Sequence, residues 1–344
     1  MQKLSRRLLL NAVLTGVAAL AGHATAWAQE TAQFPNRPIK VVVPYPAGGV
    51  VDVTARAVTE VLASHWGQSV IVENKPGANG NLGADAVRQA KPDGYTLLVG
   101  SVFTVINPLT DSNTRFKTSD FQPIARIGNT PNLWIVPANS KFNSLKDFIA
   151  EAKQKPGLFN VANPGHGSSN HLGIDRLTAD AKIELTHINY QGQPPFIADL
   201  INGRLDIAPV TAALALPHVK SGKLKVLAVI GEERLDTIPD VPTLAEVGYP
   251  NAVVVPWNGF MAPAGTPEHI INEIAQAVSK VQKSPQVLSR YAVLQAQPPT
   301  QAQAFSDLVA QEAIRWRGVF NNELHAAAKT GNLGLVEICK VPAS

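Results

Sequence analysis

Cysteine is almost absent from this chain, since Cys339 is the only one among 344 residues. A single cysteine excludes an internal disulfide and a cluster of thiolate metal ligands. Long apolar runs are also missing after residue 28, where nothing approaches the roughly 20 apolar residues that cross a bilayer. The sequence therefore predicts a fold that needs neither disulfides nor insertion into a membrane.

A strong net charge is the second absence. The formal net charge is +4, and three of the basic residues, Lys3, Arg6 and Arg7, stand at the extreme N-terminus. Without them the net charge of the remaining chain is +1. A nearly neutral protein lacks the basic face that nucleic-acid phosphates require, so we expect no nucleic-acid partner.

The N-terminus has the pattern of an export signal. The three basic residues precede an apolar segment, 8–20, and Ala26 and Ala28 supply the small residues of a cleavage point. We expect cleavage near Ala28. The paired arginines leave both the general secretion route and the twin-arginine route open.

Strands and helices alternate along the remaining chain of about 315 residues, a length that favours two domains. Amphipathic segments such as 51–67, 144–154 and 267–282 separate short apolar runs. This alternation predicts an α/β fold with parallel sheets flanked by helices. The expected strands are 39–43, 69–74, 95–101, 133–139, 159–163, 184–190, 205–210, 224–230 and 253–263.

The segment "PYPAGGVVD", 44–52, joins an expected strand to an expected helix. Ligands of open parallel sheets bind at such strand-to-helix loops. Glycine admits positive φ and close approach, while the first helical turn presents unpaired N–H donors to an anion. We expect Asp52 to cap the helix, because its charge would repel an anion. A tight turn without a ligand is an equally good interpretation of these residues alone.

A second loop of this kind is "NPGHGSSNHLG", 163–173. Its glycines free the backbone, and Ser168 and Ser169 offer hydroxyl and N–H groups to an oxygen ligand. Two anion-friendly helix starts suggest a cleft. The alternative is that Ser168 serves only as a helix N-cap.

A cofactor and a catalytic role both lack support in the sequence. Gly77, Gly80 and Gly83 do not have the spacing of a dinucleotide-binding loop, so we expect no cofactor. Ser168, His171 and Asp175 are close in sequence but lack the nucleophile elbow of hydrolases. His166 and His171 are poorly spaced for a metal, so we expect neither an enzyme nor a metal site.

Several blocks carry a family resemblance. They are "FPNRPIKVVVPYPAGGVVDVTAR", "GQSVIVENKPGANGNLGADAV", "KPDGYTLLVGS", "LPHVKSGKLKVLAV", "IPDVPTLAEVGYP" and "GFMAPAGTP", in order between about residues 34 and 320. In these blocks the chain resembles the substrate-binding proteins of tripartite tricarboxylate transporters, also called the Bug family.

The resemblance implies a periplasmic binding protein of type II-like architecture, with two α/β domains around a ligand cleft. Such a protein captures a small carboxylate and delivers it to membrane transporter subunits, and we expect it to be a monomer. The expected organisation is a signal peptide (1–28), a discontinuous first domain (34–129 plus 253–322), a second domain (130–252) and an atypical tail (323–344).

The resemblance also implies a set of ligand-binding residues. The family holds the carboxylate at the first glycine loop, and the opposite wall comes from the second loop and the segment after the next strand. Ser101, the last residue of the expected strand 95–101, belongs to the same expected site. The expected residues are Tyr45, Ala47, Gly48, Gly49, Val50, Ser101, Phe103, Asn163, Gly165, His166, Gly167, Ser168, His171, Tyr190, Gly192, Phe196 and Val210.

Departures from the family pattern suggest what the ligand is. Apolar residues stand where the family often has small or polar ones, notably Val50, Phe103, Phe196 and Val210. An apolar cleft favours a carboxylate with an aromatic or aliphatic body over citrate or an amino acid. The alternative is that some of these side chains belong to the domain cores.

Two other functions stay open at this point. One is a sensor subunit that passes a ligand-dependent change of shape to a membrane receptor. The other is an exported serine hydrolase that uses Ser168 and His171.

Overall fold

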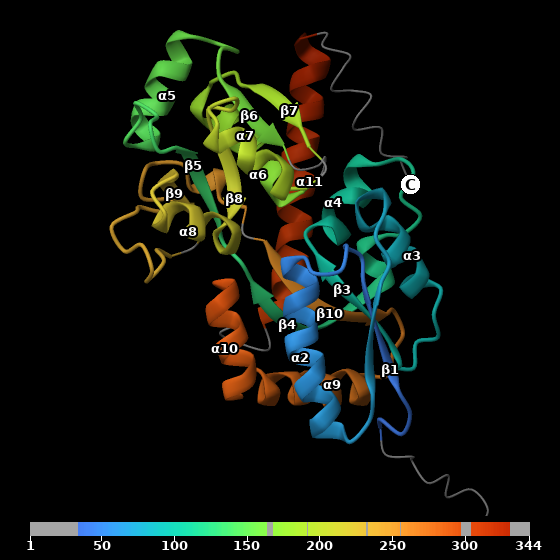
Figure 1. The fold of residues 1–344 in the computed structure, drawn as a ribbon. Coiled ribbons are helices and arrows are strands. Elements are labelled where there is room, and N and C mark those ends of the chain that lie inside the picture. The colour runs from blue at the N-terminus through green and yellow to red at the C-terminus, as the bar shows by residue number, and fades with distance from the viewer. Residues whose placement is uncertain are drawn as a thin grey trace, which may run out of the picture. The chain divides into compact units, whose positions relative to one another are not determined.

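The computed structural model describes residues 34–163, 168–190, 192–231, 233–254, 256–296 and 304–330, with side chains described as far as residue 320 in the last range (Figure 1). The expected signal peptide lies outside these residues. The chain divides into the units Met1–Asn36 and Arg37–Ser344, and the fold below is that of the second unit. Within the described part, no helix is long and apolar enough to span a bilayer.

The first sheet has five strands in the order β2-β1-β3-β10-β4. β1 pairs in parallel with β2 and β3, whereas β10 is antiparallel to β3 and β4. We call this sheet and its helices the first lobe. The strands are β1 (Ile39–Val43), β2 (Val70–Asn74), β3 (Thr96–Ser101), β4 (Phe121–Asn129) and β10 (Trp257–Pro263).

Helices pack onto the sheet of the first lobe. α2 lies beside α9 and α10 (Figure 1), whereas α11 packs on α4 and β4. Short 3-10 turns precede α3 and β4, at Ala78–Gly80 (η1) and Thr118–Asp120 (η2). The helices are α2 (Val50–Trp66), α3 (Asn81–Arg88), α4 (Phe103–Thr110), α9 (Glu268–Val281), α10 (Pro285–Leu294) and α11 (Ala304–Thr330).

The remaining strands form a three-stranded antiparallel sheet, β8-β5-β9, and a parallel pair, β6-β7. We call these strands and their helices the second lobe. The strands are β5 (Asn132–Pro137), β6 (Asn160–Asn163), β7 (Thr186–Asn189), β8 (Ala208–Thr211) and β9 (Leu224–Ile230). The helices are α5 (Leu145–Gln154), α6 (Ser169–Ala181), α7 (Pro194–Ile201) and α8 (Ala212–Lys220), and η3 (Pro250–Ala252) leads back to the first lobe.

β5 is the central strand of the second lobe, and all six of its residues are buried. Side chains alternate across a strand, so Trp134 and Val136 enter one core while Leu133 and Ile135 enter another. Burial on both faces explains why this strand reads as a continuous apolar run.

Two expectations about the sheets were wrong. The sheets are not purely parallel, because β10 and all pairings of β5 are antiparallel. A strand's direction depends on the route by which the chain returns to the sheet, which its own sequence does not encode. In addition, no strand was expected at β4, which contains Pro123. β4 is an edge strand, where proline is tolerated.

The last helix continues through part of the expected C-terminal tail. α11 extends to Thr330, so the helix includes the first eight residues of the segment 323–344. Cys339 lies outside the described residues.

Candidate ligand-binding site

The first glycine loop connects the buried strand β1 to α2. Gly48 has φ +81° and open space where a Cβ would stand, and it is exposed together with Ala47 and Gly49. Gly49 is the N-cap residue of α2 and has no side chain with which to cap the helix. The first main-chain N–H groups of this 17-residue helix therefore lie at an exposed loop, and no capping side chain accepts a hydrogen bond from them.

A buried carboxylate fixes the shape of this loop. Asp52 has 3% of its side chain exposed and forms an ion pair with Arg56 at 3.0 Å. It also accepts hydrogen bonds from the Gly48 N–H at 2.9 Å and from Asn74 Nδ2 at 2.8 Å. Asn74 Nδ2 in turn donates to the carbonyl of Tyr45 at 3.0 Å, which ties both ends of the loop to one network.

The role of Asp52 differs from the expected helix cap. The N-cap position belongs to Gly49, and Asp52 reaches back from the first turn to Gly48. The Gly48 N–H is therefore already engaged, and the Gly49 N–H donates to the carbonyl of Pro46 at 3.4 Å, so neither glycine leaves its donor bare. Burial alone would raise the pKa of Asp52, but the hydrogen bonds from Arg56, Gly48 and Asn74 lower it below its ordinary value.

Tyr45, Ser101 and Phe103 come together beside this loop. The Tyr45 hydroxyl and Ser101 Oγ form a hydrogen bond of 2.7 Å, and the Tyr45 ring meets the edge of Phe103 at a centroid distance of 6.1 Å. Burial raises the pKa of Tyr45. Phe103 begins α4 and is only 4% exposed, so most of its surface packs in the core of the first lobe.

The second glycine loop lies between β6 and α6. Gly165, His166 and Gly167 are outside the described residues, so the structure places only the two ends of the loop. At one end, the carbonyl of Asn163 accepts a hydrogen bond of 2.8 Å from the Tyr190 N–H. At the other, Ser168 is the N-cap of α6, and its Oγ accepts a hydrogen bond of 3.2 Å from the His171 N–H. The capping role that the sequence left open for Ser168 is therefore present.

The segment after β7 contributes the rest of the expected second wall. Tyr190 donates its hydroxyl hydrogen to Asp199 at 2.8 Å, and Gly192 has φ +92°. Phe196 and Val210 are fully buried in the core beside β5. For these two residues the structure shows the alternative that the sequence left open, namely that they belong to a core.

Buried amides hold the start of α6 in place. Asn170 Oδ1 accepts a hydrogen bond from Asn132 Nδ2, and Asn170 Nδ2 donates to the carbonyl of Pro209 at 2.8 Å. Leu172 is buried in the same core cluster as Phe103 and Trp257 of the first lobe. α6 is thus anchored to β5 and β8 on one side and contributes to the core of the first lobe on the other.

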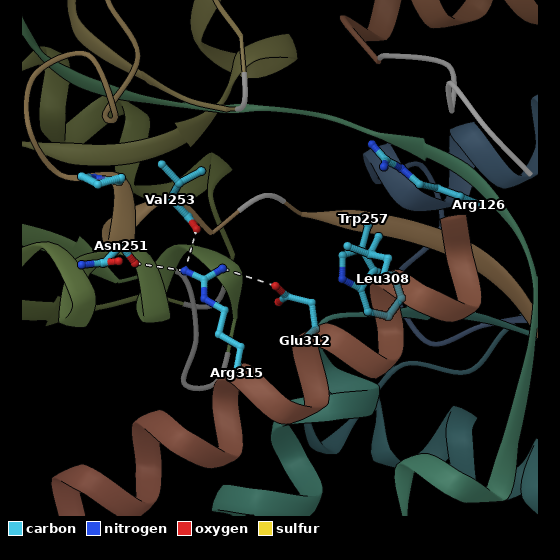
Figure 2. A pocket seen from close by; sticks show the side chains of 8 residues that line it. Arg126, Asn251, Val253, Trp257, Leu308, Glu312 and Arg315 are labelled. Carbon is cyan, nitrogen blue, oxygen red and sulfur yellow. Dashed lines mark hydrogen bonds and ion pairs between the residues drawn. The ribbon is translucent and has the colours of Figure 1, made fainter. Parts of the chain in front are cut away.

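A cavity of about 300 Å³ lies away from both glycine loops (Figure 2). Arg315 crosses its rim and donates hydrogen bonds of 3.0 Å to the carbonyls of Asn251 and Val253. Figure 2 shows the same guanidinium paired with Glu312, at 3.3 Å. This cavity adjoins the segment that returns the chain to β10, so its position suits a hinge rather than the expected carboxylate site. The cavity is lined by Arg126, Pro250, Asn251, Val253, Trp257, Leu308, Glu312 and Arg315.

The sequence points to His171 and Asp175 but predicts no metal site, because it does not connect them with His187. His171 and Asp175 on α6 lie beside His187 on β7, with one ligand atom from each within 4.8 Å of the others. The signal for it was present, because i and i+4 positions share a helix face and the next strand of the unit packs under that helix. His187 is remote in sequence, so only the packing of α6 on β7 identifies it as the third member.

Comparisons with known proteins agree with these features. Residues 54–323 match the protein family described as the tripartite tricarboxylate transporter family receptor. The chain is 34% identical over 317 residues to protein BugT of Bordetella pertussis, which covers 90% of this chain and 96% of that protein.

Solved structures of similar proteins share the fold. A MatC protein of Rhodopseudomonas palustris with bound malate is 31% identical, covers 83% of this chain and 99% of its own, and has a TM-score of 0.73. An R. palustris protein with adipate is 29% identical, covers 84% and 97%, and has a TM-score of 0.74. Both contain a small dicarboxylate.

Proposed function

The chain belongs to the tripartite tricarboxylate transporter receptor family, and on that premise we propose that it is a periplasmic solute receptor that captures a small carboxylate. The observation that carries the proposal is the exposed start of α2, where Gly49 provides no cap for the first N–H groups. Such a helix start favours a negatively charged oxygen ligand. The malate and adipate in two similar structures support the same class of ligand.

The ligand carboxylate would bind at Tyr45, Ala47, Gly49 and Val50. The Gly48 N–H is occupied by Asp52, so the donors available at this loop are those of the first turn of α2. The charge of Asp52 is balanced by Arg56, so it does not oppose an incoming anion as a bare carboxylate would.

The second wall of the site would come from Asn163 and the loop that leads into α6. Ser168 and His171 begin that helix, and Tyr190 and Gly192 stand at the end of the neighbouring strand. We propose that this group faces the first loop across a cleft between two domains, 34–129 plus 253–322 and 130–252. Gly165, His166 and Gly167 belong to the same proposal by the family resemblance.

We propose an aliphatic body for the ligand. Phe103, Phe196 and Val210 are buried in cores and do not supply the apolar contact expected from them. Among the described residues of the proposed site, the half-buried Val50 and Tyr45 supply it instead. This smaller apolar surface suits a short methylene chain better than an aromatic ring. The adipate bound by a similar protein is an aliphatic dicarboxylate.

We also propose that the protein is not an enzyme. The matched family is one of transporter receptors, and the Ser168 Oγ acts as the N-cap of α6 by accepting a hydrogen bond from the main-chain N–H of His171. The proposed partners are the membrane subunits of the transporter, and the proposed receptor is an exported monomer cleaved near Ala28. A sensor role would differ in its membrane partner and not in its ligand.

The first experiment identifies the ligand. The mature protein is purified and denatured, released small molecules are analysed by mass spectrometry, and the emptied protein is screened by thermal shift against aliphatic, aromatic and tricarboxylic acids. Because a ligand that binds only the native state raises the apparent stability, an aliphatic dicarboxylate should raise the melting temperature with its concentration. A shift with none of these acids would contradict the carboxylate proposal, and a shift with aromatic acids alone would contradict the aliphatic body.

A further inference from the structure

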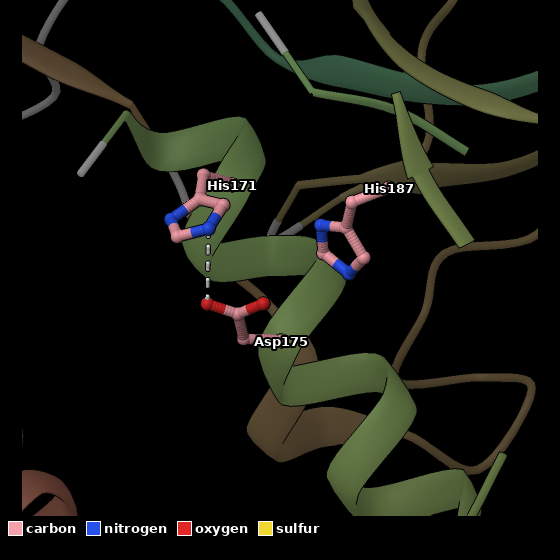
Figure 3. A group of neighbouring side chains, drawn as sticks. All are labelled: His171, Asp175 and His187. Atoms are coloured by element: carbon pink, nitrogen blue, oxygen red, sulfur yellow. Dashed lines mark ion pairs between the residues drawn. The ribbon is translucent and has the colours of Figure 1, made fainter. Parts of the chain in front are cut away.

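Two histidines and one aspartate converge on the second lobe, outside the carboxylate contacts proposed at the first loop (Figure 3). His171 Nε2 lies 3.6 Å from Asp175 Oδ2. The His187 ring stands nearly perpendicular to that of His171, at 79°, with a centroid distance of 6.0 Å. Figure 3 shows the three side chains gathered at the same side of α6, with the Asp175 carboxylate between the two imidazoles.

The local fold accounts for this convergence. β6, α6 and β7 form a strand-helix-strand unit whose strands pair in parallel. His171 and Asp175 are four residues apart and therefore share a face of α6. In β7, His187 is the half-buried residue between the exposed Thr186 and Ile188, so its side chain points to the opposite side of the strand from theirs.

The donor set is one that binds transition metals. Two imidazole nitrogens and one carboxylate oxygen are typical ligands of Zn²⁺, and three protein ligands leave a fourth position for water. Ligand atoms about 2.0–2.1 Å from a tetrahedral ion lie about 3.3 Å from one another. The 3.6 Å between His171 Nε2 and Asp175 Oδ2 is close to this value, and one ligand atom from each of the three residues lies within 4.8 Å of the others.

Charge and access also favour a cation at this place. Neutral imidazoles and a carboxylate all donate lone pairs to a divalent cation. The Asp175 side chain is 45% exposed and that of His171 is 12% exposed. An ion can therefore reach the carboxylate from solvent, and the less exposed imidazoles can bind it on its inner side.

We propose that His171, Asp175 and His187 form a binding site for a divalent transition metal, with Zn²⁺ as the ion that the donor set fits best. The ion joins α6 to β7. Its binding raises the stability of the native protein, because the three ligands come together only when the helix packs on the strand. The site shares His171 with the second wall of the proposed carboxylate site, so metal binding is measured in the absence of carboxylate.

Metal binding is tested by calorimetric titration with Zn²⁺ and by thermal shift. The full mature chain is used without a polyhistidine tag, after treatment with EDTA and removal of the chelator, in buffer free of carboxylates. His187→Gln and Asp175→Asn each remove one ligand. Because the Asp175 side chain is 45% exposed, Asp175→Asn should have little effect on folding. His269→Ala is the matched control, because His269 is an exposed histidine in the first turn of α9.

The expected result is one Zn²⁺ per chain, with affinity reduced about tenfold or more in both ligand variants and unchanged in His269→Ala. The melting temperature of the unaltered protein should rise with Zn²⁺, and the rise should shrink in the ligand variants. Absence of saturable binding, or binding that His187→Gln and Asp175→Asn leave intact, would overturn the proposal. Neither outcome depends on whether the protein binds a carboxylate.

Discussion

Asp52 governs the first glycine loop although it does not face the ligand in the proposed site. Its carboxylate joins the Gly48 N–H, Arg56 and Asn74, and Asn74 continues to the Tyr45 carbonyl. One buried side chain thus shapes the loop and leaves the start of α2 uncapped. Separate substitutions can therefore test the shaping of the loop by Asp52 and the binding of the ligand by the first turn of α2.

Replacing Val50 with proline removes one main-chain donor from the proposed site. Proline is tolerated at the first position of a helix, and Gly49 before it already has φ −70° and ψ 161°, which a following proline requires. We expect stability to change little and carboxylate affinity to fall about 10- to 100-fold, the effect of about 1.5–3 kcal/mol for a hydrogen bond to a charged group.

Glu268→Pro is the matched control for this substitution. Glu268 is the exposed first residue of α9, and Pro267 before it is also extended, with ψ 137°. Titration calorimetry of the ligand found by mass spectrometry compares the two variants. Equal affinity in Val50→Pro and the unaltered protein would show that the first turn of α2 does not bind the carboxylate.

Replacing Asp52 with asparagine removes the charge from the bracing network. We expect a loss of about 1–3 kcal/mol of unfolding free energy at pH 7. Because the folded pKa of Asp52 is lowered, its stabilisation is fully present above the unfolded pKa of about 3.9 and is lost as the pH falls through the folded value. The difference between the two proteins should therefore shrink as the pH is lowered below about 4.

Urea unfolding across this pH range measures the effect of Asp52→Asn. Asp236→Asn, at an exposed turn position, serves as the control, with an expected change within about 0.5 kcal/mol. A stability difference that grows toward low pH would contradict the assigned role of Asp52.

At the scale of elements, the last helix closes the core of the first lobe. Phe305 and Trp316 of α11 are buried there, and the Phe305 ring packs edge-on against Trp257 at a centroid distance of 5.4 Å. The close approach depends on Gly259 in β10, where an added Cβ would lie 2.2 Å from the Phe305 ring and 2.9 Å from the Ala125 carbonyl. A glycine in the middle of a strand is here a packing requirement.

Gly259→Ala should therefore loosen α11 from the sheet. We expect the free energy of unfolding to fall by about 1–3 kcal/mol, because the Phe305 ring and the neighbouring backbone must both shift. Gly318→Ala, within exposed α11 surface and with open space around the added Cβ, should instead stabilise the protein by about 0.5–1 kcal/mol. Thermal unfolding of the two variants gives the comparison, and equal effects would contradict the packing role of Gly259.

At the scale of the whole molecule, the chain passes between the two sheets twice. It leaves the first sheet at Asn129, enters β5 at Asn132, and returns through η3 into β10. Arg315 of α11 binds the carbonyls of Asn251 and Val253 in the return segment, so the last helix holds this crossing. Two crossings permit a hinge between the proposed domains.

Ligand binding should make the protein more compact if this hinge closes. Small-angle scattering of the emptied protein should show a lower radius of gyration once the identified carboxylate is added. Val50→Pro at the same ligand concentration should show a smaller change, because less of it is bound. An unchanged radius for the saturated protein would argue against closure.

Sequence reasoning was most successful where neighbours along the chain decide the outcome. β1, α2 and the glycine loop between them agree with the expected ranges, because a β-branched run, a pair of glycines and an apolar period of 3.6 are local features. The resemblance to the receptor family was confirmed by the match over residues 54–323. The expected ligand-binding residues stay a prediction.

Only the tertiary structure decided the direction of β10, the burial of Phe196 and Val210, and the meeting of His187 with His171. Each depends on which surfaces distant segments present to one another. The sequence by itself determined most of the order of helices and strands, the place of the glycine turn and the family, because these follow from local backbone preferences and from matched blocks. The strand β4 and the absence of a side-chain cap on α2 came only from the structure. A side chain's face, partner and exposure arise from packing between elements far apart in the chain, and local patterns do not encode them.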